Sequence, residues 1–167
     1  MLVAIGDTHG TDDHRLSDPV LAAVREADRV VHTGDFTREP VLDAIRAEAG
    51  HLLAVAGNND EAAVRERVPE TRTFDAMGRR FVVTHGHQQD DTARSLLARQ
   101  EDADVLMVGH SHRPEIRDLG EVVEVNPGSY ADPRWYQPAF AVVERQGGDP
   151  VARLVHADGT ALERVGL

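Results

Sequence analysis

The chain has 167 residues, with 29 acidic side chains against 18 basic ones, a formal net charge of −11 and no cysteine. This length suits one domain with its own core, and the lack of cysteine excludes disulfides, thiolate metal sites and a catalytic thiol. Every basic residue is an arginine. Stable nucleic-acid binding is not expected, because it relies on basic stripes that neutralise phosphates.

The apolar residues at the start of the chain end at Ile5, before Gly6 and Asp7. This run is too short for a signal peptide or a membrane span. We therefore expect a soluble, cytoplasmic protein with no membrane partner.

The first part of the chain alternates short apolar runs with helical patterns, which predicts strands joined by helices. Ser17 is a suitable N-cap for the first helix, with Pro19 in its first turn. Pro69 is expected to end a short third helix. The predicted strands are 2–5, 29–33, 52–56, 81–84 and 105–108. The first predicted helix begins near residue 17, and three further helices cover 40–49, 60–68 and 92–100.

The pattern changes from residue 114 onward to strands without long helices. Turn residues divide these strands, and this suits antiparallel pairing. No repeat or long linker interrupts the chain, so we predict a single mixed α/β layered domain over residues 1–167. The strands expected here are 115–119, 122–125, 139–144 and 151–156.

Five of the strand-like runs end in a small polar motif that carries a candidate metal ligand. Ligands in open α/β sheets bind outside the carboxyl ends of the strands, and glycines allow the sharp turns required there. Each motif alone is compatible with a turn or a helix cap. Their occurrence together predicts one metal site. The motifs are Gly6-Asp7-Thr8-His9, Gly34-Asp35, Gly57-Asn58-Asn59-Asp60, His85-Gly86-His87 and Gly109-His110-Ser111-His112.

The remaining histidines are interpreted more simply. His32 lies inside a strand-like run and is expected to be a hydrogen-bonded core residue. His51 and His156 are expected to be solvated. His14, in the loop after the first motif, is more easily explained as a loop residue than as a substrate contact.

A short aromatic cluster follows the segment Asn126-Pro127-Gly128-Ser129. Its members are Tyr130, Trp135 and Tyr136. The cluster is compatible with a pocket, a dimer interface or ordinary loop packing.

The five motifs, in this order, resemble the signature of the calcineurin-like metallophosphoesterase superfamily: Asp-x-His, Gly-Asp, Gly-Asn-x-Asp/Glu, a lone His and Gly-His-x-His. The resemblance covers Asp7 to His112 and is highly specific. The short length and the segment from Asn126 to Ser129 are similar to the branch of small bacterial and archaeal phosphodiesterases. That branch is related to the retromer subunit of vacuolar protein sorting. The stretch His85-Gly86-His87-Gln88 is similar to the corresponding stretch of that subunit. The resemblance implies a layered α/β sandwich with two mixed β-sheets flanked by helices.

The same resemblance implies a centre of two divalent metal ions. Asp35 would bridge the two ions. Imidazole, carboxylate and amide ligands suit Mn²⁺, Fe²⁺, Ni²⁺ or Zn²⁺, and Mn²⁺ is preferred here. Asp7, His9, Asp35 and His112 would hold one ion, and Asp35, Asn58, His85 and His110 the other.

The implied reaction is hydrolysis of a small phosphoester, most simply a phosphodiester, by in-line attack of a bridging hydroxide on phosphorus. Charge supports it independently, because two divalent ions outweigh the carboxylates of Asp7 and Asp35 and leave the site positive. Asn58 would also contact the phosphate.

The chain departs from many family members at Asn59, where they place a histidine. Asparagine does not titrate and cannot act as a general acid, so His87 becomes the candidate proton donor. We therefore expect aryl leaving groups to be cleaved faster than alkyl ones.

Two other functions fit the motifs less well. The first is a protein-interaction scaffold of the same fold with weak or no catalysis, and the second is a structural site for a single metal with four ligands. The full set of seven ligands favours the enzyme, because burying so many polar groups without a metal is costly. Edge strands in the second half also suggest a homo-oligomer.

Overall fold

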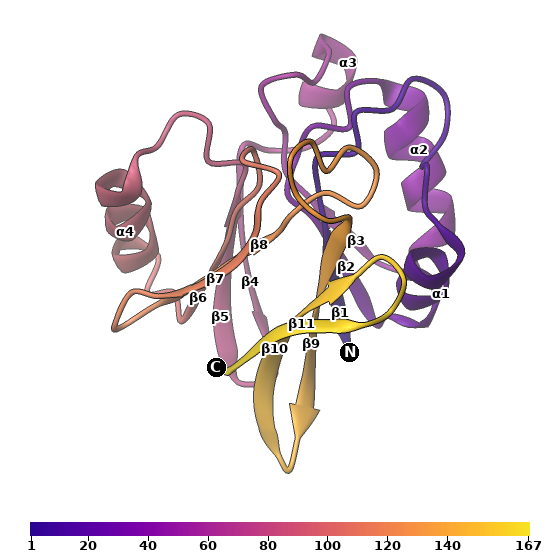
Figure 1. Cartoon of the computed structure of the whole chain (residues 1–167). Coiled ribbons are helices and arrows are strands. Elements are labelled where there is room, and N and C mark those ends of the chain that lie inside the picture. Colours follow the sequence, from indigo (N-terminus) through magenta and orange to yellow (C-terminus); the bar gives the residue numbers. More distant parts are fainter.

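Two β-sheets lie face to face in the computed structural model, which describes residues 1–167, and helices cover their outer faces (Figure 1). The apolar side chains between the sheets form one buried cluster that includes Leu2, Phe81 and Leu154. The expected layered α/β sandwich with two mixed sheets is therefore confirmed.

The first sheet has six strands in the order β11-β10-β9-β1-β2-β3. Its three strands β1, β2 and β3 are parallel, whereas β9 runs antiparallel to β1 and brings the C-terminal strands into the sheet. Val3 at the centre pairs with Val30 on one side and Val142 on the other. The strands are β1 (Leu2–Ile5), β2 (Arg29–His32), β3 (Leu52–Ala54), β9 (Ala139–Gln146), β10 (Asp149–His156) and β11 (Ala161–Gly166).

The second sheet has five strands in the order β4-β5-β6-β8-β7. Strands β5, β6 and β8 are parallel, and the two edge strands are antiparallel to their neighbours. The strands are β4 (Thr71–Ala76), β5 (Arg79–Thr84), β6 (Val105–Met107), β7 (Pro114–Asp118) and β8 (Val123–Pro127).

Helices pack on the outer face of each sheet (Figure 1). Val24 of α1 and Ile45 of α2 share a buried cluster with Val3 of the first sheet. Ala98 of α4 packs with Leu106 of the second sheet. None of the helices is long and apolar enough to cross a membrane. The helices are α1 (Asp18–Glu26), α2 (Glu39–Glu48), α3 (Ala62–Arg65) and α4 (Asp91–Gln100).

Every predicted strand and helix is present, with ends that differ by a few residues, but three expectations need correction. Strands β4 and β11 were not predicted, because they are edge strands that carry little hydrophobic pattern: β4 has no fully buried side chain, and β11 is largely exposed. The third helix covers Ala62–Arg65 instead of 60–68, since the Asp60 carboxylate accepts hydrogen bonds from the neighbouring loops. Strand β8 pairs antiparallel with β7 but parallel with β6.

Helix α1 starts where the sequence predicts, and Ser17 occupies the N-cap position, but its side chain makes no capping hydrogen bond. Its hydroxyl donates to the carbonyl of Ala157 at 3.5 Å, and no side-chain cap is formed. In contrast, the Asp90 side chain accepts from the backbone N–H of Ala93 at 2.8 Å and caps α4.

Candidate metal centre

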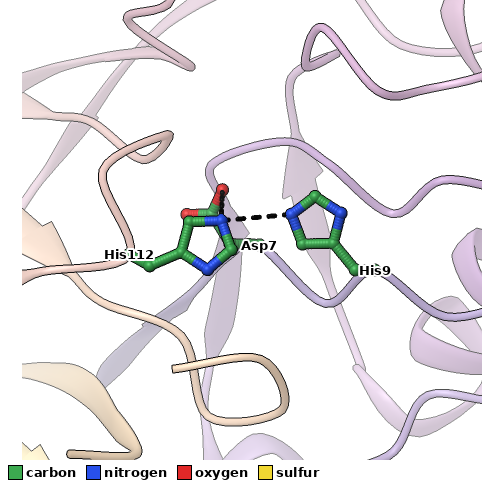
Figure 2. A group of neighbouring side chains, drawn as sticks. All are labelled: Asp7, His9 and His112. Atoms are coloured by element: carbon green, nitrogen blue, oxygen red, sulfur yellow. Dashed lines mark hydrogen bonds and ion pairs between the residues drawn. The ribbon is translucent and has the colours of Figure 1, made fainter. Parts of the chain in front are cut away.

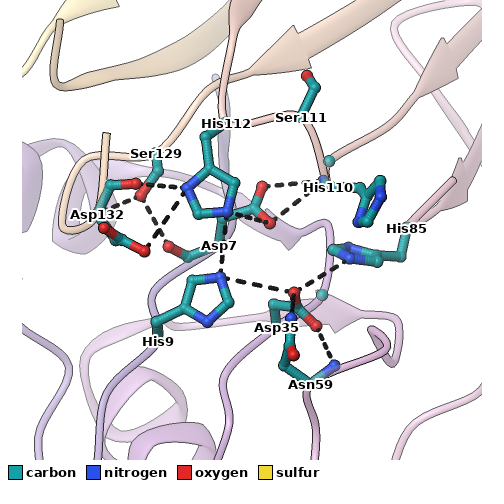
Figure 3. Close-up of polar contacts among 12 residues, drawn as sticks. Asp7, His9, Asp35, Asn59, His85, His110, Ser111, His112, Ser129 and Asp132 are labelled. Atoms are coloured by element: carbon teal, nitrogen blue, oxygen red, sulfur yellow. Dashed lines mark hydrogen bonds and ion pairs between the residues drawn. The ribbon is translucent and has the colours of Figure 1, made fainter. Parts of the chain in front are cut away.

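The five polar motifs meet at one edge of the sandwich, between the two sheets (Figure 3). Strands β1, β2 and β3 end there in one sheet, and β5 and β6 end there in the other. Parallel strands place their carboxyl ends at the same edge, so loops distant in sequence meet.

One group of candidate ligands consists of Asp7, His9 and His112 (Figure 2). One ligand atom from each lies within 4.8 Å of the others. Nε2 of His112 is 3.5 Å from Oδ1 of Asp7 and 3.2 Å from Nε2 of His9. Asp7 and His112 are completely buried, whereas His9 is half-buried, so the group opens to solvent on the His9 side.

A second group consists of Asp7, Asp35 and His85, again with ligand atoms within 4.8 Å of one another. Nε2 of His85 is 3.3 Å from Oδ2 of Asp35 and 3.1 Å from Oδ1 of Asn58. Oδ2 of Asp35 is also 3.6 Å from Nε2 of His9. Asp35 therefore belongs to the second group and also lies near His9 of the first, and Asp7 is common to both groups.

His110 and His87 flank the exposed side of the second group. The ring of His110 lies edge-on to His85, with centroids 5.2 Å apart, and its backbone N–H donates to Asp7 at 3.1 Å. The ring of His87 is 5.3 Å from that of His85 and 6.2 Å from that of His110. The His110 side chain thus belongs to neither compact group, although it borders one of them.

The backbone at five candidate ligands has the left-handed conformation that L-residues rarely adopt. Such residues cost about 1–3 kcal/mol each and cluster at functional sites. Each of these loops begins at the end of a paired strand, β1, β2 or β6. The φ angles are 50° at Asp7, 45° at His9, 60° at Asp35, 68° at His110 and 59° at His112.

Two glycines allow the loops to approach this closely. A Cβ atom on Gly57 would lie 2.1 Å from Oδ1 of Asp35, inside the van der Waals radius of the carboxylate. Gly34 has a φ of 104°, and a Cβ there would lie 2.8 Å from Nδ1 of His85. Glycine at these positions is required by the site itself.

The donor set fits a cation, and the histidine tautomers show why. Nδ1 of His85 donates to the carbonyl of Thr33 at 2.8 Å, and Nδ1 of His112 donates to the carbonyl of Asp132. A carbonyl only accepts, so each ring carries its proton on Nδ1 and directs the Nε2 lone pair into the site. At His85 this lone pair faces the acceptor oxygens of Asp35 and Asn58. Only a cation or an additional proton makes that arrangement favourable.

The pKa directions in the metal-free site agree with this interpretation. Burial raises the pKa of the Asp7 carboxyl to about 7. Burial also acts to raise the pKa of Asp35, but hydrogen bonds from His85 and Asn59 hold it well below its ordinary value. Burial acts to lower the pKa of His85, but its hydrogen bond with Asp35, together with the negative charges of Asp35 and Asp7, raises it. Without metal, a proton on His85 therefore takes the place of a cation.

A series of buried hydrogen bonds connects the first two motifs, through Thr8 and Gly34, to His32 and Tyr130. The backbone N–H of Gly34 donates to Nδ1 of His32 at 3.2 Å, so Nε2 of His32 donates to the Thr8 hydroxyl at 2.9 Å. Thr8 in turn donates to the Tyr130 hydroxyl at 3.0 Å, and Tyr130 donates to the carbonyl of His14 at 2.5 Å. His32 is thus the buried, hydrogen-bonded residue that its sequence position predicts.

The other histidines also lie where their context predicts. Nδ1 of His14 accepts from the N–H of Leu16 at 2.9 Å, and its Nε2 is 3.6 Å from Asp13, so it belongs to its own loop. His51 is exposed, and His156 is partly exposed beside a surface cleft.

Two supporting residues were not assigned a role from the sequence. Asp60 is buried and accepts from the N–H groups of Gly57 at 2.7 Å and Thr37 at 2.7 Å. Ser129 donates to the carbonyl of Asp7 at 2.7 Å. Both belong to motifs that the sequence singles out, but their roles depend on contacts between loops.

Comparison with known proteins identifies the family of this chain. Residues 1–148 match the calcineurin-like phosphoesterase superfamily domain. A protein of Methanothermobacter thermautotrophicus named "probable metallophosphoesterase" is 32% identical over 151 residues, which cover 88% of this chain and 87% of that protein.

Two solved structures show the same fold. Zinc-bound Vps29 of Entamoeba histolytica superposes with a TM-score of 0.80 and 25% identity, covering 99% of this chain and 98% of that one. The phosphoesterase YfcE of E. coli gives a TM-score of 0.76 at 21% identity, covering 98% of this chain and 97% of that one. The family match, the relatives and the site place this chain in the calcineurin-like phosphoesterase superfamily.

Proposed function

We propose that this protein is a phosphodiesterase that depends on two divalent metal ions, with Mn²⁺ the preferred ion and Fe²⁺, Ni²⁺ or Zn²⁺ as alternatives. The observation that carries the proposal is the pair of overlapping ligand groups, in which acceptor atoms face one another around Asp35. Asp7, His9, Asp35 and His112 would hold one ion, and Asp35, Asn58, His85 and His110 the other.

Two such ions would supply an activated water and neutralise charge on the phosphoryl oxygens. The protein prepares this chemistry by fixing its ligands. The carbonyls of Thr33 and Asp132 hold His85 and His112 with Nε2 directed inward. Asn59 holds both oxygens of Asp35, and the exposed Asn58 lies at the open side, where it can donate to a phosphoryl oxygen.

We assign His87 to the leaving-group side of the site, because it borders the second ligand group and faces a cleft. It lines a cleft of about 260 Å³ together with Gly57, Arg65 and Glu70. Burial lowers the pKa of His87, so its neutral form predominates near pH 7. We infer that His87 stabilises the leaving oxygen by a hydrogen bond and supplies a full proton poorly. This agrees with the expected preference for aryl over alkyl leaving groups.

The likeness to Vps29 supports a second candidate, a protein-interaction scaffold with weak or no catalysis. The inward-facing Nε2 atoms favour the enzyme, because a scaffold has no need of a solvent-accessible cluster that attracts cations. The two candidates make different predictions for the isolated protein.

The test is hydrolysis of bis(p-nitrophenyl) phosphate with each of the four metals, together with the metal content of the protein. We expect metal-dependent turnover that falls at least about a hundredfold in Asp35→Ala and His110→Ala. The exposed His51→Ala is the matched control and should retain full activity. Unchanged rates in both site variants would refute the proposal. Metal binding without turnover in the unmodified protein would favour the scaffold.

A further inference from the structure

The loop after β8 is hydrogen-bonded directly to residues of the candidate metal centre. Ser129 donates to the carbonyl of Asp7 at 2.7 Å, and the carbonyl of Asp132 accepts from His112 (Figure 3). Arg15 donates to the carbonyl of Ala131 at 2.9 Å and to that of Thr8 at 3.0 Å. The beginning of this loop is therefore held at the site.

Arg134, two residues after Asp132, has an unpaired guanidinium. Most arginines of this acidic chain donate hydrogen bonds or form ion pairs, as Arg67 and Arg117 do. Arg134 is exposed and does neither. It lies two residues after Asp132, whose carbonyl accepts from His112, so it is held close to the candidate metal centre. A guanidinium in this position is available for an anionic ligand.

Trp135 follows immediately and is 93% exposed. It lies three residues after Asp132, so their Cα atoms are at most about 11 Å apart. An indole that covers so little protein surface contributes almost nothing to the core. It offers a flat face on which an aromatic group can stack.

We propose that Arg134 and Trp135 form a recognition subsite at the rim of the metal centre for phosphodiesters that carry a nucleobase. The guanidinium binds a phosphoryl oxygen, and the indole stacks on the base. This inference rests on the proposed function, because it assumes that phosphoesters bind at the centre. It adds the chemical class of the substrate.

The first test compares two diesters with the same leaving group, thymidine 5′-(p-nitrophenyl phosphate) and methyl p-nitrophenyl phosphate. Trp135→Ala should lower kcat/KM for the thymidine ester at least about fivefold and leave the methyl ester within about twofold, and Trp135→Phe should retain most of the preference. Arg134→Gln should lower kcat/KM for both esters about tenfold or more, because both carry the phosphoryl group. Equal losses on the two esters in Trp135→Ala, or no loss on either, would overturn the nucleobase subsite.

The controls lie on the edge strand β11, where Arg164 and Leu162 are also exposed. Arg164→Gln and Leu162→Ala should change neither substrate preference nor rate. A loss in Arg164→Gln equal to that in Arg134→Gln would show that general surface charge, and not a subsite, is responsible.

The second test does not depend on turnover. Trp135 is the single tryptophan of the chain, so its fluorescence reports on the subsite alone. Thymidine 5′-monophosphate should quench this emission in the metal-loaded protein, whereas methyl phosphate should not. Quenching without any hydrolysis would leave the subsite standing and refute the proposed function. Hydrolysis without quenching by thymidine 5′-monophosphate would do the reverse.

Discussion

Asn59 holds both carboxylate oxygens of Asp35. Its side-chain amide donates to Oδ2 at 2.7 Å, and its backbone N–H donates to Oδ1 at 2.8 Å. This is the position at which the resemblance leads one to expect a histidine. The structure therefore shows what the asparagine does instead: it orients a carboxylate that belongs to the second ligand group and lies near His9 of the first.

Removal of this amide should weaken metal binding without unfolding the site. Asn59→Ala keeps the backbone donor and removes the side-chain donor, and loss of such a supporting hydrogen bond typically weakens metal affinity about 10–100-fold. Asn59→Asp should be worse, because it places a second negative charge against Asp35. Calorimetric titration with Mn²⁺ measures both. Unchanged affinity in Asn59→Ala would show that the backbone N–H alone is sufficient.

The role of His87 can be separated from general damage by varying the leaving group. We expect His87→Ala to lower kcat/KM at least about tenfold for a phenyl diester, whose leaving oxygen needs stabilisation. For the nitrophenyl diester the change should stay within about twofold, since that leaving group is already stable as an anion. The measurement is hydrolysis of a series of substituted phenyl diesters, in which kcat/KM of His87→Ala should depend more steeply on the leaving-group pKa than kcat/KM of the unmodified protein. An equal loss along the series would assign His87 to binding instead.

Metal affinity should fall as the pH falls below 7. Burial raises the pKa of Asp7 to about 7 in the metal-free protein, so near neutrality a proton occupies a carboxylate that the metal needs. Below this pKa the proton on Asp7 alone should cost up to about tenfold in affinity per pH unit, and the proton on His85, whose pKa is also raised, should add to this loss. His9 and His112 have lowered pKa values, owing chiefly to burial, and should not compete. Calorimetric titration with the metal in two buffers of different ionisation enthalpy counts the protons released on binding. A metal affinity that stays constant from pH 5.5 to 7.5 would contradict the predicted competition by protons.

The raised pKa of Asp7 has the opposite effect on the stability of the metal-free protein, which should fall as the pH rises. The folded state holds a proton on Asp7 that the unfolded state, with an ordinary pKa of 3.8, releases earlier. The free energy of unfolding should therefore decrease as the pH rises from about 4 to about 7. Bound metal removes this loss, because it stabilises the ionised carboxylate.

Local sequence features were sufficient to predict every strand except β4 and β11, and to place the candidate ligands in loops that meet in the structure. The buried run Leu2–Ile5 followed by Gly6 and Asp7 specifies both a strand and its ligand-bearing turn. Strand β11 was missed, because Ala161–Gly166 is largely exposed and is defined by pairing with β10. Edge strands of this kind owe their structure to their neighbour more than to their own residues.

The contacts that complete the site depend on how the two sheets stack, and sequence spacing does not reveal this. Nothing near Thr33 or Asp132 indicates that their carbonyls fix the tautomers of His85 and His112. Likewise, the motifs do not show that Asp7 belongs to both ligand groups, since this requires the end of β1 to face the end of β5.

The hydroxyl of Tyr130 should contribute to stability through the series of hydrogen bonds that connects it to His32. Tyr130 is 6% exposed, and its hydroxyl accepts from Thr8 and donates to the carbonyl of His14. Tyr130→Phe leaves the buried Thr8 hydroxyl and the partly buried His14 carbonyl without this contact, and we expect it to lower the free energy of unfolding by about 1–3 kcal/mol. Tyr136→Phe is the matched control, because Tyr136 is 39% exposed and its change should stay within about 0.5 kcal/mol. Urea denaturation of the metal-free proteins measures both, and equal stability of the two variants would mean that ordered water replaces the hydroxyl of Tyr130.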